Sequence, residues 1–132
     1  MRLHVTPLRR LWRDTRGAAA LEFGILLPVF IPLVLGIMQF GQLFWTQTAL
    51  QHAVDMAARC ATVDAATCGS TSSTQTYAAT QAYGLTFPDG TFAATAAACG
   101  NQVTATYTFP FMGAAWFSAA SVNLSAQSCY PV

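Results

Sequence analysis

A long apolar run constrains most strongly what this chain can fold into. Between Phe23 and Trp45 no side chain is charged, and the only strongly polar residues are Gln39 and Gln42. A hydrocarbon layer of about 30 Å is crossed by about 20 apolar residues in a helix that rises about 1.5 Å per residue. The run is long enough, and Trp45 lies where such a helix would meet the headgroups. We therefore predict one membrane-spanning helix.

The arginines predict the orientation of this helix. Arg59 is the only arginine that follows the apolar run, and the chain contains no lysine. The arginines that precede it are Arg2, Arg9, Arg10, Arg13 and Arg16. Because positive charge is retained in the cytoplasm, the N-terminus is expected to be cytoplasmic and the C-terminal part exported.

The cysteines all lie on the expected exported side. They are Cys60, Cys68, Cys99 and Cys129. An even number of cysteines in a small exported domain favours disulfides over zinc, and no pair has CxxC spacing. Three pairings are possible. The order of the predicted elements favours Cys60 with Cys68 and Cys99 with Cys129. The second pair requires a bend if the two cysteines flank a central strand.

Beyond the apolar run the pattern becomes one-sided. Residues 47–62 are predicted to continue the helix as an amphipathic extension into the periplasm. Asp55 and Arg59 are spaced as an i, i+4 ion pair, and His52 is expected to face solvent. The predicted inner face consists of Ala49, Leu50, Ala53, Val54, Ala57, Ala58 and Ala61.

Residues 63–132 are expected to form a small exported domain. Val63–Thr76 has the composition of a loop, and Ser72 or Ser73 could cap a short helix through about Tyr83, ended by Gly84. In this helix Tyr77, Ala78, Ala82 and Tyr83 would face inward.

Alternating apolar and polar residues predict three antiparallel strands in the last third of the chain. They are Phe92–Cys99, Val103–Phe111 and Val122–Gln127. The connection Met112–Ser118, with Trp116 and Phe117, either seals the sheet over the helix or forms a contact patch. The expected fold class is thus α+β, a long N-terminal transmembrane helix packed on a small domain with a short helix and a three-stranded sheet.

The residues before and within the apolar run resemble a known family. Arg16–Phe23 reads RGAAALEF and is similar to the processing site of type IV pilin-like precursors. With the features that follow it, this segment resembles the N-terminal region of TadE-like minor pilins, or pseudopilins, of the Tad (Flp, type IVc) pilus system. These features are the prolines Pro28 and Pro32, Gly36, the pair Phe40–Gly41 and the segment Ala57–Arg59. TadF-like and TadG-like relatives share such N-termini, but the short exported part favours TadE.

The resemblance implies that a prepilin peptidase cuts after Gly17. Residues 1–17 would be a cytoplasmic leader, residues 18–46 the transmembrane helix, and Ala18 the new N-terminus. Glu22, followed by Phe23, would then neutralise the amine of a neighbouring subunit. A carboxylate near the edge of the hydrocarbon costs a few kcal/mol, so it is rarely left without a partner. The alternative is that Glu22 only marks the start of the span.

Pro28 and Pro32 lie one turn apart within the expected span. Each removes a backbone donor, so a helix kink is expected. The kink either allows the helix to unwind when the subunit leaves the bilayer, or is static.

No arrangement of residues typical of a catalytic, metal or phosphate site follows the span. We therefore expect a non-enzyme with no cofactor, no metal, no nucleic-acid partner and no small-molecule substrate. The resemblance implies a bacterial inner-membrane protein with a periplasmic C-terminus, present in the pilus or at the cell surface after assembly. Its partners would be the prepilin peptidase, other pilin-like subunits, the Tad assembly machinery and membrane lipid, and its role would support surface adhesion. The alternative is an unprocessed single-pass protein whose exported domain binds another envelope protein.

Overall fold

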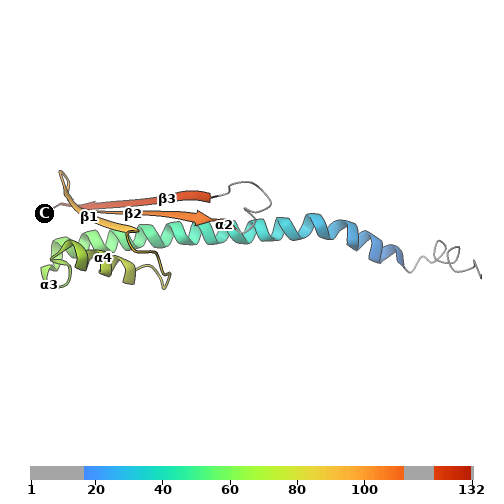
Figure 1. Cartoon of the computed structure of the whole chain (residues 1–132), viewed down its shortest axis with the longest axis horizontal. Coiled ribbons are helices and arrows are strands. Elements are labelled where there is room, and N and C mark those ends of the chain that lie inside the picture. Colours follow the sequence, from blue (N-terminus) through green and yellow to red (C-terminus); the bar gives the residue numbers. More distant parts are fainter. Residues whose placement is uncertain (1–16, 112–120, 132) are drawn as a thin grey trace, which may run out of the picture. The chain divides into compact units, whose positions relative to one another are not determined.

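The computed structural model describes residues 17–111 and 121–131, which fall into two compact units (Figure 1). Unit 1 ends at Met38 and unit 2 begins at Gln39. Helix α2, Ala18–Val63, contributes its first part to unit 1 and its second part to unit 2. The leader predicted at residues 1–17 lies outside the described residues except for Gly17.

In unit 1 the described residues form a helix whose apolar side chains are exposed. The exposed large side chains are Leu21, Phe23, Ile25, Leu26, Val29, Phe30, Ile31, Leu33, Leu35, Ile37 and Met38. By length and composition this helix could cross a membrane. One N-terminal apolar helix of this kind fits a single-pass membrane protein. Pro28 and Pro32 both lie inside the helix.

Unit 2 contains the second part of α2, two short helices and a sheet. Helix α3 is Ala65–Cys68 and α4 is Thr71–Thr80. The strands β1 (Phe92–Ala97), β2 (Gly100–Pro110) and β3 (Ser121–Tyr130) pair antiparallel in the order β1-β2-β3. The sheet runs alongside the second part of α2 (Figure 1). The α+β class and the three-stranded antiparallel sheet are therefore confirmed.

The core of unit 2 is a face of α2 made of small and branched residues. Of the predicted inner face, all but Ala61 are fully buried, and Ala61 is half-buried. The α2 residues of the core cluster are Leu50, Ala53, Val54, Ala57 and Ala58. They pack with Phe92, Val103, Ala105, Leu124 and Ala126 of the sheet, with Ala78 of α4 and with Ala82 just after α4. Alanine side chains leave little distance between helix and sheet, so few large residues are needed to fill the core.

The segment predicted as a loop is largely helical. It contains α3 and the start of α4, and the cap of α4 is Ser70 rather than Ser72 or Ser73. The Ser70 hydroxyl accepts a hydrogen bond from the Ser73 backbone N–H, and the Ser73 hydroxyl accepts one from the Ser70 N–H. This reciprocal capping stabilises a helix whose Ser and Thr content alone favours a loop.

The predicted end of this helix was also wrong. Helix α4 ends at Thr80, and Tyr83 and Gly84 both have positive φ, +50° and +76°. Ala78 and Ala82 are buried as expected, but Tyr83 is exposed rather than inward-facing.

The strand boundaries differ from the predicted ones by a few residues. Strand β1 ends before Cys99, and β2 begins at Gly100, where φ is +122°. A Cβ at Gly100 would collide with the Tyr130 carbonyl oxygen, so glycine is required for this close approach of strands. The predictions for Met112–Ser118, including Trp116 and Phe117, lie outside the described residues.

Candidate functional site

The candidate processing site lies at the start of α2. Gly17 is exposed and directly precedes Ala18, the first residue of the helix. A chain cut after Gly17 would therefore begin as a helix. Glu22 is exposed and lies just beyond the first turn, which contains no acidic residue. Because the helix dipole acts mainly within the first turn, it provides Glu22 with little compensation.

Near the prolines, the surface of α2 forms an open apolar groove. Its volume is about 490 Å³, and every lining residue is apolar. They are Phe23, Leu26, Leu27, Val29, Phe30 and Leu33. This groove includes Phe23 of the candidate site. Bulky apolar side chains exposed on all sides of a helix need lipid or neighbouring helices to cover them.

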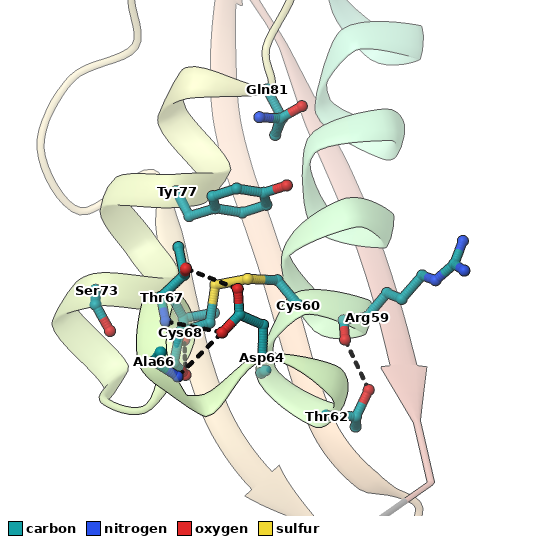
Figure 2. Close-up of a disulfide and its surroundings, with 12 residues drawn as sticks. Arg59, Cys60, Thr62, Asp64, Ala66, Thr67, Cys68, Ser73, Tyr77 and Gln81 are labelled. Atoms are coloured by element: carbon teal, nitrogen blue, oxygen red, sulfur yellow. Dashed lines mark hydrogen bonds between the residues drawn. A yellow bond between two sulfur atoms is a disulfide. The ribbon is translucent and has the colours of Figure 1, made fainter.

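Two disulfides hold unit 2 together, with the pairings that the element order favoured. Cys60 at the end of α2 is joined to Cys68 of α3, with a Cα–Cα distance of 5.7 Å (Figure 2). Cys99 and Cys129 are joined with a Cα–Cα distance of 6.3 Å. Cys99 lies in the turn between β1 and β2, which provides the bend that this pair requires. In the described part of the chain no cysteine is free.

Asp64 organises the connection beside the first disulfide (Figure 2). Its carboxylate accepts hydrogen bonds from the Thr67 hydroxyl at 2.7 Å and from the backbone N–H groups of Ala66 and Thr67. These bonds, chiefly the one from the Thr67 hydroxyl, lower the pKa of Asp64 below its ordinary value. The carboxylate is thus the N-cap of α3.

The predicted pair of Asp55 and Arg59 is not formed. Asp55 instead accepts a hydrogen bond from the Ser128 hydroxyl at 2.6 Å, on strand β3. A bond to the packed sheet fixes the carboxylate better than a long exposed arginine on the same helix. His52 is half-buried, and its ring stacks on Tyr83 at a centroid distance of 4.6 Å, so the expectation that it simply faces solvent was wrong.

Glutamines of α2 bind the outer edge of the sheet, a role that sequence reasoning missed. Gln47 donates its side-chain N–H to the Ser125 carbonyl at 2.9 Å, and Gln51 donates to the Gln127 carbonyl at 3.4 Å. With Asp55 they form a polar row at i, i+4 and i+8 along the helix. This spacing indicates that the three side chains share one face of α2, but it does not reveal which strand lies opposite that face.

The described residues contain no group of three or more His, Cys, Asp or Glu side chains that could hold a metal ion. A polar hollow in unit 2 has a volume of about 350 Å³ and is lined by the end of α2, by α3 and α4, and by strands β1 and β2. Thr74 and Asn101, which line it, are already hydrogen-bonded to the Cys68 and Ala61 carbonyls.

A family model described as TadE-like protein matches residues 17–59. The match begins at Gly17 and ends at Arg59, so it includes the candidate processing site and nearly all of α2. The resemblance drawn from the sequence is confirmed over these residues, and TadE-like proteins are a structural, non-enzymatic family. No curated protein and no solved structure matches the chain.

Proposed function

We propose that this chain, whose residues 17–59 are TadE-like, is a minor pilin or pseudopilin that takes part in assembly of a Tad (Flp, type IVc) pilus. One observation carries the proposal. The family match begins at Gly17, and the helix begins at the next residue. The expected product of cleavage after Gly17 is therefore a helix from its first residue.

In this proposal the chain inserts with its leader in the cytoplasm and its C-terminal part in the periplasm. A prepilin peptidase then cuts between Gly17 and Ala18. The reaction frees an ammonium group at Ala18, four residues before Glu22. In a bundle of subunits, Glu22 of one helix neutralises the Ala18 amine of its neighbour, which offsets the cost of a carboxylate at the hydrocarbon edge.

The exposed apolar surface of unit 1 supports a role in assembly. None of its large side chains is buried within the described chain, so lipid covers them before assembly and other subunits cover them in a filament. Unit 2 has its own core and disulfides and can remain folded in either setting. As a component of the pilus, the chain would support surface adhesion.

The proposal is tested by the N-terminal residue of the protein extracted from membranes. Cells that contain an active prepilin peptidase should yield a chain starting at Ala18, and Gly17→Leu should retain the leader. Gly36→Leu is the matched control, because a Cβ at Gly17 and one at Gly36 both project into open space. Full-length protein in such cells would contradict the proposal and favour an unprocessed single-pass protein.

A further inference from the structure

We propose that unit 2 itself contacts the bilayer through four exposed aromatic rings, which together we call the aromatic surface. Phe40, Phe44 and Trp45 lie around α2 just after Gln39, and the ring of Tyr83 contacts that of Trp45. The inference depends on the membrane location in the proposed function. It adds a second contact, because Tyr83 belongs to the connection after α4 and not to the span.

The exposure of these rings distinguishes one end of unit 2. Phe40, Phe44, Trp45 and Tyr83 are 58%, 66%, 57% and 54% exposed. In the described part of unit 2 the only other exposed large apolar residues are Val63 and Val122. Three of the four rings lie within the first turns of α2 after Gln39, where the chain passes from unit 1 into unit 2.

The tertiary structure holds Tyr83 against this part of α2. Its ring lies 4.6 Å from the ring of His52 and 5.8 Å from that of Trp45, measured between centroids. The backbone of Tyr83 has φ of +50°, a left-handed conformation that residues other than glycine rarely adopt. The reversal of the chain at Tyr83 and Gly84 thus places an exposed aromatic ring beside Trp45.

The chemistry of the surface fits the headgroup region of a bilayer. Tryptophan and tyrosine combine an apolar ring with a polar tip and are enriched at this depth. The surface follows the apolar run of α2 directly along the same helix, so the span would bring it to the membrane. Asp55 and Arg59 lie about 15 Å or more beyond Trp45 along the helix axis, which keeps their charges in water. The remaining acidic residue between α4 and the sheet, Asp89, is not part of the aromatic surface and is exposed in the turn before β1.

The test places a single tryptophan reporter at each of three positions in the full chain. In the background Trp12→Phe/Trp116→Phe, Trp45 is the only tryptophan. Adding Trp45→Phe/Tyr83→Trp to this background moves the reporter to position 83. Adding Trp45→Phe/Val63→Trp instead moves it to an exposed position at the C-terminal end of α2. Each protein is reconstituted in phosphatidylcholine vesicles whose acyl chains carry bromine, and iodide is used as the aqueous quencher. Circular dichroism verifies that each variant keeps the parent fold.

We expect brominated lipid to quench most of the fluorescence at positions 45 and 83, with weak quenching by iodide, and the reverse at position 63. Quenching by bromine at position 45 but not at position 83 would overturn the inference while leaving the span intact. Protection of position 83 from iodide only at high protein density would also overturn it, because a second copy would then be the partner. Absence of bromine quenching at both positions would reject the membrane premise itself. The cleavage assay after Gly17 tests the proposed function independently.

Discussion

Glu22 is the only charged residue of α2 before Asp55. In the single chain its side chain is exposed, beside apolar residues that need lipid or neighbouring helices around them. The proposed role of this carboxylate therefore depends on a partner that arises only on cleavage and assembly. Its substitution separates these two steps.

We predict that Glu22→Ala leaves cleavage after Gly17 intact and reduces the number of pili. The variant removes the negative charge that would pair with the Ala18 amine. It does not hinder insertion of the helix into the membrane. N-terminal sequencing measures the cleavage, and electron microscopy counts the pili. Gln42→Ala, which removes an uncharged polar side chain from the same helix, should change neither. Normal piliation of Glu22→Ala would refute the charge pairing.

The capping role of Asp64 predicts how the stability of unit 2 depends on pH. Because hydrogen bonds lower its pKa in the folded state, the carboxylate stabilises unit 2 above the ordinary aspartate pKa of about 3.9. The contribution is lost as the pH falls below that value and through the lowered pKa of the folded state. Urea unfolding in detergent should show Asp64→Ala less stable than the parent at neutral pH. The difference should shrink in strong acid, and a difference independent of pH would contradict the capping role.

At the scale of elements, the contact of α2 with the sheet depends on small side chains. We predict that Ala53→Leu destabilises unit 2 by about 2 kcal/mol, because Ala53 is fully buried and extra methylene groups would force the helix from the sheet. Ala79→Leu is the matched control, since Ala79 is exposed on α4. The free energy of unfolding, measured by urea titration, should differ little from the parent in the control. Equal effects of both substitutions would contradict this account of the packing.

The glutamine row gives a second prediction at this scale. Gln47→Ala removes the 2.9 Å bond to the Ser125 carbonyl and should cost about 1 kcal/mol of stability. Gln51→Ala should cost less, because its bond to the Gln127 carbonyl is longer, 3.4 Å. Amide hydrogen exchange of β3 should accelerate in the first variant. A larger effect of Gln51→Ala would show that the length of these hydrogen bonds does not determine their contribution to stability.

For the whole molecule, the two disulfides should contribute unequally. They close segments with sequence separations of 8 and 30 residues. In the chain-entropy model these closures stabilise the fold by about 2.5 and about 3.6 kcal/mol. Replacing Cys99 and Cys129 by alanine should therefore lower the unfolding midpoint more than replacing Cys60 and Cys68. The opposite order would mean that native contacts, rather than constraint of the unfolded chain, dominate.

The features that were predicted correctly from the sequence are those that depend on patterns within one segment of the chain. The apolar run from Phe23 defines a possible span without reference to any other residue. The repeat from Ala49 to Ala61 defines the buried face of α2, since every member follows the same helical period. In the same way, the alternation of apolar and polar residues along β2 defines the buried face of the sheet. The predicted order of the elements was enough to favour both disulfide pairings.

The features that were missed have two physical reasons. Serine and threonine hydroxyls favour loops in the absence of a cap, so composition predicts a loop over Val63–Thr76, where Asp64 and Ser70 cap α3 and α4 through bonds to residues up to three positions away. Other missed contacts join residues far apart in the sequence. The spacing of Asp55 and Arg59 predicts an ion pair on the helix, because the sequence does not show that the Ser128 hydroxyl reaches Asp55 from β3.

The sequence predicted one apolar helix from the length of the run, and a TadE-like start from a motif resemblance. The inward face of the helical extension and the alternation of the strands were predicted from the period of a single element. The folded chain was needed to show that Tyr83 lies beside Trp45 and that Gln47 binds the edge of β3. These contacts join separate elements, and their geometry depends on how helix and sheet pack together.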